Sequence, residues 1–244
     1  MINKYYFILL FFWCQNIYSV DLMAYHIVGV DSNNDGHETN LLIGISPAEK
    51  HKTSVDYLSQ VRVIGQSKLK DSLTSLNYYY SAENYYMNIV LGVNSTSVFL
   101  PELKTGINLY YNIYDYLELN VGYTLNDYSS NSVDLIRVGG AYSFLDRCTL
   151  GFNTYLSQQS ESVYSFSIMN RCEWRIVGYR LDYGLGETFA DIGIKDEFSE
   201  ASLYVYLKSN RLKYGIKSRR YVSNFINETY IGLQLDYSFD WGKF

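Results

Sequence analysis

Residues 117–126 read LELNVGYTLN, and apolar and polar side chains alternate along this stretch. Successive side chains of an extended strand point to opposite faces, so one face of this segment is apolar and the other polar. Residues 231–241, IGLQLDYSFDW, repeat the alternation over a length that suits a tilted strand crossing a membrane. Two such segments, far apart in the chain, predict a sheet with one apolar and one polar face.

The same two-residue period recurs along the chain, and after the first segment no stretch sustains a period of 3.6. Marking every alternating segment predicts fourteen strands, with twelve as the alternative because strand ends are uncertain by several residues. The predicted strands cover residues 22–30, 40–47, 55–64, 72–80, 85–93, 104–113, 117–125, 132–143, 148–156, 162–170, 175–184, 201–207, 212–221 and 229–241.

The composition indicates that the apolar face meets lipid. The chain has 27 tyrosines, and the tyrosine ring settles where hydrocarbon meets water. A mean hydropathy of −0.14 excludes a bundle of membrane helices, whereas a barrel is compatible with it because only alternate residues touch lipid. A soluble β-sandwich, the alternative, would expose its tyrosine-rich face to water and bury its polar face.

Hydrocarbon offers no hydrogen-bond partner to a free sheet edge, so a sheet inserted in lipid must pair its last strand with its first. We therefore predict an all-β fold, a closed antiparallel transmembrane up-and-down β-barrel. Short links at 81–84, 114–116, 144–147 and 208–211 fall on one side of the sheet. Longer polar links at 31–39, 94–103 and 187–200 fall on the other. This asymmetry is typical of periplasmic turns and external loops, with both termini periplasmic.

Residues 1–20 have the order of a signal peptide. Lys4 precedes an apolar run over 5–14, and a polar exit leads to Ser19. The run is shorter than the roughly 20 residues of a spanning helix. Trp13 stands where a lipidated Cys14 would need a small residue, which argues against a lipoprotein. We expect cleavage after Ser19 or Val20, leaving residues 21–244 as the barrel domain.

This organisation predicts the outer membrane of a Gram-negative bacterium, after signal-peptide cleavage, as the location. The partners expected there are outer-membrane lipid, lipopolysaccharide and the barrel-assembly machinery. A net charge of −5 without a basic block excludes nucleic acid as an expected partner. The sequence predicts no oligomeric state.

Charged residues on the polar face are expected to line the lumen. Lys213, Lys217 and Arg219 would bias a water-filled passage slightly towards anions or hydroxyl-rich solutes. Opposite charges, such as Arg180 and Asp182, can instead cross-link and plug a narrow lumen. The predicted lumen-facing residues are Arg62, Glu118, Arg137, Arg180, Asp182, Lys213, Lys217, Arg219 and Asp236.

No catalytic, cofactor or metal site is predicted. His26, His37 and His51 lie in no recognisable nucleophile or metal motif. The loop at 31–36 contains Asp31, Asn33 and Asp35 and begins like a calcium loop, but its twelfth position is Leu42 rather than glutamate. An acidic external loop explains it better.

Two cysteines remain after the expected cleavage, Cys148 and Cys172, and a hairpin centred near Gln159 brings them to the same rim of the barrel. The oxidising periplasm permits a disulfide between them. Whether they face each other depends on a strand register that the sequence leaves open, so two free thiols are the alternative.

Three local features resemble the YaiO-type family of outer-membrane β-barrel proteins. Residues 91–101 are similar to its glycine-bearing strand followed by an aromatic residue and a proline. Residues 183–186 and the closing run 232–244 resemble its late glycine segment and final strand, although Gly242 shifts Phe244 to the opposite pleat from Trp241. The resemblance covers residues 85–244 and implies that Phe244 is an assembly signal. It carries over no catalytic residue.

These observations predict an integral, non-enzymatic outer-membrane barrel that acts as a passive channel for small or saccharide-like solutes. The alternatives are a barrel hydrolase acting on lipid or peptide, and a structural or envelope-assembly barrel with a plugged lumen.

Overall fold

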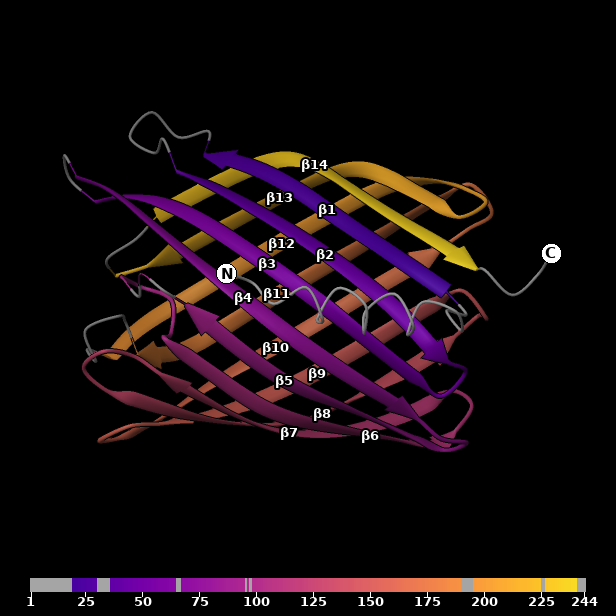
Figure 1. The fold of residues 1–244 in the computed structure, drawn as a ribbon, viewed down its shortest axis with the longest axis horizontal. Helices are drawn as coiled ribbons and strands as arrows, with labels where there is room; N and C mark the ends of the chain where they lie inside the picture. The colour runs from indigo at the N-terminus through magenta and orange to yellow at the C-terminus, as the bar shows by residue number, and fades with distance from the viewer. Residues whose placement is uncertain are drawn as a thin grey trace, which may run out of the picture.

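A computed structural model describes residues 19–29, 36–64, 67–94, 96, 98–189, 195–224 and 227–240. In these ranges the chain forms fourteen antiparallel strands that run diagonally around a closed barrel (Figure 1). They are β1 (Ser19–Gly29), β2 (His37–Ala48), β3 (His51–Ile64), β4 (Ser67–Ser81), β5 (Tyr85–Asn94), β6 (Leu103–Tyr114), β7 (Leu117–Asp127), β8 (Ser132–Phe144), β9 (Cys148–Gln158), β10 (Ser162–Glu173), β11 (Val177–Phe189), β12 (Lys195–Ser209), β13 (Leu212–Ser223) and β14 (Asn227–Asp240).

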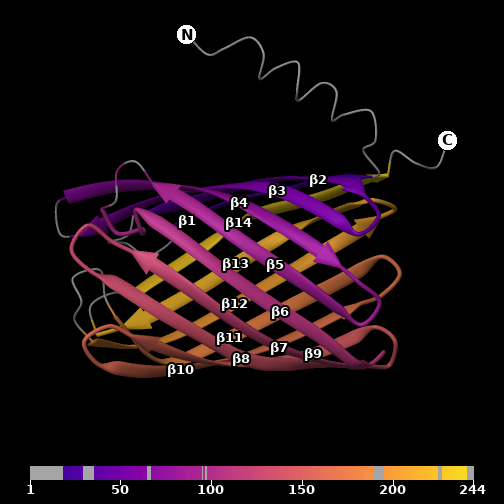
Figure 2. The same ribbon diagram turned by 60° about the horizontal axis from the view of Figure 1, so that its bottom comes forward.

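Each strand pairs with its sequence neighbours, and β1 also pairs with β14 to close the sheet. The β1–β14 register runs from Ser19 opposite Asp240 to Gly29 opposite Tyr230 without a shift. Figure 2 shows the same wall from a second direction, with the early and late strands meeting along one seam. The prediction of a closed up-and-down barrel with fourteen strands, rather than twelve, is confirmed. Within the described ranges, no helix has the length and hydropathy needed to cross a bilayer.

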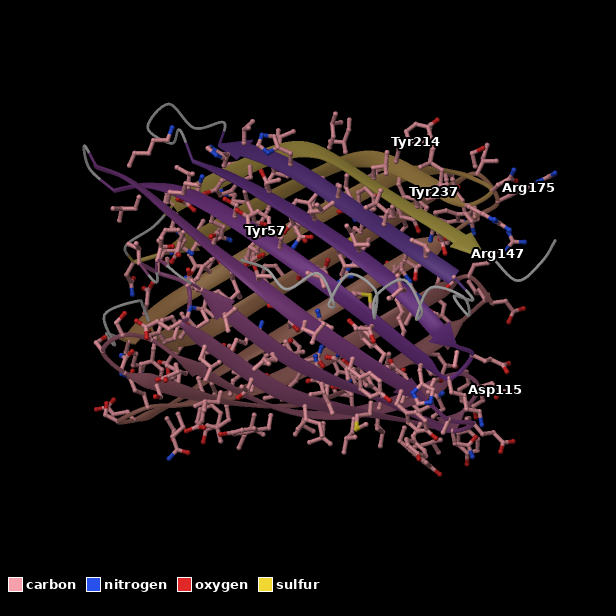
Figure 3. The ribbon with its side chains drawn as sticks, in the orientation of Figure 1. Tyr57, Asp115, Arg147, Arg175, Tyr214 and Tyr237 are labelled. Carbon is pink, nitrogen blue, oxygen red and sulfur yellow. A yellow bond between two sulfur atoms is a disulfide. The ribbon has the colours of Figure 1, made fainter. Side chains whose placement is uncertain are left out.

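The period-two alternation separates an apolar outside from a polar inside. Along β7, Leu119, Val121 and Tyr123 are all exposed on the outer surface, while Asn120 and Gly122 point into the barrel. Tyr214 and Tyr237 likewise project from the outside of the wall (Figure 3). Large apolar side chains in such numbers on the outer surface match a protein whose solvent there is hydrocarbon.

The two ends of the barrel differ. At the end where β1 begins and β14 ends, called here the terminal end, short turns carry Asp115, Arg147 and Arg175 (Figure 3). The turn between β8 and β9 places Leu145 and Asp146 at φ values of 55° and 54°, the two positive values of a type I′ turn, which the backbone hydrogen bond from Arg147 N to Phe144 O closes.

Outward-facing aromatic rings gather near the terminal end. Tyr114 stacks on Tyr116 at a ring-centroid distance of 5.3 Å, Tyr116 meets Tyr142 at 5.8 Å, and Tyr142 stacks on Phe144 at 6.3 Å. Amphipathic rings in this position form the aromatic girdle of a membrane barrel, because each ring can keep its hydroxyl in the headgroup region.

The strands extend farther at the opposite end, called the distal end, than the alternation predicts. β11 continues to Phe189 and β12 begins at Lys195, so the prediction of a long link over 187–200 is wrong. Glu187 and Lys195 form an ion pair of 2.7 Å on the outer face. Beyond the hydrocarbon layer, outward side chains no longer need to be apolar. The strands therefore stay paired there although apolar and polar residues no longer alternate in the sequence.

The described chain begins inside the expected signal peptide. Ser19 and Val20 belong to β1 and pair with β14, whereas cleavage after Val20 would remove both of them. The cleavage site stays a prediction. Most of the acidic 31–39 loop and residues 241–244, including Phe244, lie outside the described residues.

The sidedness of the wall is tested by two neighbouring positions of β12. Leu203 is exposed on the outer face, and the hydroxyl of Ser202 bonds Asp182 inside the barrel. A lysine at a lipid-facing position near mid-membrane costs about 2–4 kcal/mol. Leu203→Lys should therefore lower the free energy of unfolding by about that amount in urea titrations of vesicle-inserted protein. Ser202→Lys, beside a carboxylate in the lumen, should stay close to the unsubstituted protein, and equal losses would contradict the assignment.

Candidate functional site: the barrel lumen

Side chains from strands that are not neighbours in the sheet contact one another, which is possible only on the concave inner face of a closed wall. Glu173 of β10 reaches Lys213 of β13, and Tyr86 of β5 donates a hydrogen bond of 2.8 Å to Glu118 of β7. Arg137 of β8 donates one of 2.7 Å to the hydroxyl of Tyr110 on β6. The structure places all nine predicted lumen residues on this inner face.

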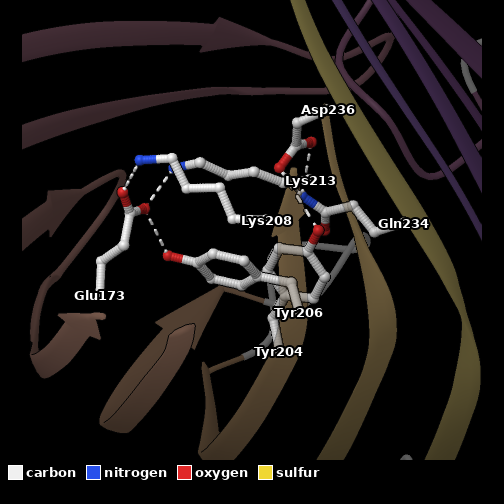
Figure 4. Close-up of polar contacts among 7 residues, drawn as sticks. All are labelled: Glu173, Tyr204, Tyr206, Lys208, Lys213, Gln234 and Asp236. Atoms are coloured by element: carbon white, nitrogen blue, oxygen red, sulfur yellow. Dashed lines mark hydrogen bonds and ion pairs between the residues drawn. The ribbon is translucent and has the colours of Figure 1, made fainter. Parts of the chain in front are cut away.

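A charged network lies in the lumen towards the terminal end (Figure 4). Glu173 accepts hydrogen bonds from Lys208, from Lys213 and, at 2.9 Å, from the hydroxyl of Tyr206. Beside it, Asp236 accepts a bond of 3.0 Å from the Gln234 side chain. One carboxylate thus pairs with two ammonium groups, and about a third of each lysine side chain remains accessible to solvent.

A second network crosses the seam where the barrel closes. Glu38 of β2 forms an ion pair of 2.9 Å with Arg219 of β13, bridging β1 and β14 between them. Tyr25 and Gln60 donate further hydrogen bonds to the same carboxylate. Because Glu38 is buried, these three donors are needed to offset the loss of water around its charge.

Aromatic rings complete this seam. The Lys217 ammonium lies 3.7 Å from the centroid of the Tyr25 ring, and the Arg219 guanidinium lies 4.8 Å from that of Tyr230. Both contacts are cation–π interactions, which stabilise a cation that has lost part of its hydration. The closure of the sheet is therefore reinforced from inside by side chains of five strands, β1, β2, β3, β13 and β14.

Arg180 and Asp182 form a bidentate pair on β11, with Nε and Nη2 donating at distances of 2.9–3.0 Å. Both point into the barrel, yet 55% of the Arg180 side chain and 33% of the Asp182 side chain are accessible to water. Space for solvent therefore remains around this pair inside the barrel.

The segment between β5 and β6 folds into the distal mouth around one carboxylate. Oδ2 of Asp71 accepts hydrogen bonds from three consecutive backbone amides, those of Val98, Phe99 and Leu100, at 2.8–2.9 Å. Its other oxygen accepts bonds from the side chains of Thr96 and Asn94, both at 2.7 Å. The inward-facing Asp71 is almost completely buried beneath this segment.

The docked segment narrows the mouth with an aromatic ring. Phe99 is only 4% exposed, and the guanidinium of Arg62, on the inner face of β3, lies 4.4 Å from its ring centroid. The predicted lumen residue Arg62 thus packs on a folded-in segment rather than facing open water. The role of Asp71 in this arrangement is to hold the backbone of the segment in place.

Comparison with known proteins identifies the barrel. The model of a family described as "YaiO membrane beta barrel domain" matches residues 19–174. The chain belongs to the YaiO family. The predicted resemblance is thereby confirmed, although the match ends before two of the segments that suggested it, 183–186 and 232–244. No curated protein matches the sequence.

Solved structures of outer-membrane proteins share the fold. A bacterial polysaccharide outer-membrane secretin aligns with 91% of this chain and 98% of its own, with a TM-score of 0.57 and 11% identity. The CymD monoaromatic hydrocarbon channel aligns over 91% and 88%, with a TM-score of 0.61 and 9% identity. The KdgM porin aligns over 90% and 99%, with a TM-score of 0.52 and 13% identity. The protein is an outer-membrane β-barrel of the YaiO family with a porin-like fold.

The alternation of apolar and polar residues did not predict several residues that line the lumen of the YaiO barrel. Glu38 and Asp71 lie just outside the predicted strands, in polar segments without apolar neighbours, and Glu173 lies three residues beyond the predicted end of its strand. Extending the inward positions Ser165 and Ser167 by steps of two would have found Glu173. No local signal marks Asp71, whose partners lie 23 to 29 residues farther along the chain.

The cysteines lie outside the lumen. Cys148 and Cys172 are direct register partners of β9 and β10, and a disulfide joins them. They share the outward-facing pleat, where the hydroxyl of Tyr179 lies 3.4 Å from the Cys172 sulfur and the ring of Trp174 lies 5.8 Å from that of Tyr179. The bond therefore cross-links two wall strands near the terminal end.

Asp71→Asn should release the segment at the distal mouth. Both oxygens of Asp71 act only as acceptors, so an amide nitrogen at either position would face a donor. Each bond to a charged acceptor contributes about 1.5–3 kcal/mol, so losing two of them makes undocking more frequent by a factor of at least about 100. Cleavage by chymotrypsin after Phe99 should accelerate accordingly in the folded barrel.

Asp127→Asn is the matched control, because Asp127 accepts a bond from Ser132 across the neighbouring β7–β8 turn and does not touch the segment. Equal cleavage rates in the two variants would show that Asp71 does not hold the segment in place.

Proposed function

We propose that this YaiO-family barrel is a non-enzymatic, passive channel for small polar solutes, including saccharides. The observation that carries the proposal is Arg180, an inward-pointing side chain that is more than half exposed although a closed wall surrounds it. Such exposure requires water in the lumen. A water-filled passage lined by charged and hydroxyl groups is the structural basis of permeation through a porin-like barrel.

The inner wall suits uncharged polar solutes better than ions of one sign. Of the three basic residues expected to attract anions, Lys213 pairs with Glu173 and Arg219 with Glu38, while Lys217 packs on the ring of Tyr25. Tyrosine hydroxyls also line the inner face, on Tyr86, Tyr110 and Tyr206 among others. Two barrels of similar fold are a bacterial polysaccharide outer-membrane secretin and the KdgM porin, which agrees with a solute-conducting role.

A hydrolase is less well supported. His26 and His37 have their rings 5.8 Å apart on the outward face, and His51 bonds Tyr78 on the same face. All three histidines of the chain thus lie away from the lumen. A lipid or peptide hydrolase working in the lumen would need a general base there that titrates near neutral pH.

A barrel with a closed lumen is favoured by one feature, the docked segment at the distal mouth with its buried Phe99. Recording single-channel currents in planar bilayers separates this alternative from a channel. Ohmic current steps from the purified barrel support the channel. A silent membrane in the presence of inserted, protease-resistant barrels would contradict it.

Charge reversal in the lumen should change ion preference. Replacing Lys213 and Lys217 with glutamate leaves Glu173 and Glu38 beside new carboxylates, so the permeability of potassium relative to chloride should rise several-fold. The shift in reversal potential across a potassium chloride gradient measures this ratio. Arg147→Glu combined with Arg175→Glu, an equal change of charge on two turns at the terminal end, is the control, and the same shift in both double variants would contradict a lumenal origin.

A further inference from the structure

A recess opens in the inner wall where β9, β10, β11 and β12 run side by side. Its volume is about 230 Å³, less than the roughly 300–1,000 Å³ of pockets for drug-sized ligands. The inward side chains that line it come from all four strands, and Glu200 among them borders the Glu38 network through Arg219. They are Tyr155, Ser165, Ser167, Asp182, Phe198 and Glu200, together with Gly184.

Small residues create the recess. Ser167 of β10 lies opposite Gly184 of β11, so two neighbouring positions of the wall carry almost no side chain, while Tyr155 and Phe198 project on either side. A Cβ added at Gly184 would lie 3.6 Å from the nearest backbone atom and 3.8 Å from Cε2 of Phe198, which are ordinary contacts. Packing therefore does not require glycine at this position, and the space is available to a ligand.

Gly186, two residues farther along β11, shows the contrast. Its φ is +137°, and a Cβ there would lie 2.5 Å from Cα of Ser165, so backbone geometry alone demands glycine. No such constraint acts on Gly184.

The walls of the recess combine an apolar ring with hydrogen-bonding groups. The phenyl ring of Phe198 stacks on Tyr221 with centroids 5.9 Å apart and an angle of 12° between planes, which fixes the ring from the β13 side. The Tyr155 hydroxyl lies 3.5 Å from that of Ser167. Asp182 and Glu200 supply carboxylate oxygens that accept hydrogen bonds from hydroxyl groups.

Charge in the recess is largely compensated. Asp182 is paired with Arg180 and also accepts a bond of 3.3 Å from Ser202. Arg219 lies close enough to Glu200 to interact with its charge. A cation therefore gains little there, and an anion meets two carboxylates.

We propose that this recess is a binding subsite for one ring of a neutral saccharide passing through the lumen. The inference rests on the proposed channel function and assigns it a solute class and a site. The apolar C–H face of a sugar packs against Phe198, and its hydroxyls bond Glu200, Asp182 and the two serines. A single weak subsite beside an open lumen holds the solute without trapping it, as permeation requires.

Maltose binding to the full barrel tests the proposal directly, measured by saturation-transfer NMR in a detergent without a sugar headgroup. The protein should bind maltose, and Gly184→Val and Phe198→Ala should each weaken binding at least tenfold. The first substitution fills the recess and the second removes its apolar wall. Glu200→Gln, which keeps the shape but removes the charged acceptor, should weaken binding several-fold.

Gly44→Val is the matched control, because Gly44 also faces inward, on β2, and a Cβ there meets chiefly the flexible end of Lys52 at 3.0 Å. This variant should bind maltose like the unsubstituted barrel. Absence of maltose binding, equal binding by the Gly184→Val and Phe198→Ala variants, or displacement of maltose by potassium ions would each overturn the subsite.

Current recordings keep this inference apart from the proposed function. Ohmic steps without maltose binding would leave the channel standing and the subsite refuted. Maltose binding that is sensitive to Gly184→Val, in a barrel that carries no current, would support the subsite and refute the channel. In a conducting barrel, added maltose should produce brief current blocks that Gly184→Val abolishes.

Discussion

The pairing of β1 with β14 is the interaction on which the rest of the structure depends. In hydrocarbon, an unpaired backbone amide or carbonyl has no partner, so a sheet that crosses a membrane is stable only when its two edges meet. Eleven register pairs make this seam, and the Glu38–Arg219 ion pair spans it from within. Once the edges are joined, the alternation of side chains separates two solvents, with lipid outside and water inside.

The inner face then divides into three levels with different chemistry. At the distal mouth, Asp71 accepts hydrogen bonds from the backbone of the segment that carries Phe99, and this segment narrows the passage. Farther in, Arg180 and Asp182 stand in water beside the recess at Gly184. Towards the terminal end, Glu173 forms ion pairs with two lysines, Lys208 and Lys213. Acidic and basic side chains lie side by side at the second and third levels, which agrees with the proposed passage of a neutral, hydroxyl-bearing solute.

The sequence predicted the architecture because the pattern that defines it is local. Residues 117–126 show both faces of a strand, and repetition of that pattern gives the strand number and the inward set. It did not predict contacts that depend on register or on distant segments. The Cys148–Cys172 pairing required the β9–β10 register, and the role of Asp71 required a segment more than twenty residues away to fold back. The recess at Gly184 was equally hidden, because it arises from small residues on adjacent strands.

Closure can be measured by cross-linking the seam. Ala24 and Leu235 are register partners on the outward face of β1 and β14, within the Cα separation that a disulfide can bridge. In a chain carrying Cys14→Ser, the double substitution Ala24→Cys and Leu235→Cys should form an intramolecular bond that closes the chain covalently and changes the migration of the boiled, unreduced protein. The offset pair Ala24→Cys and Leu233→Cys should not link efficiently. Failure of the first pair to link, equal linking of the offset pair, or links only between molecules would contradict a barrel closed at this seam.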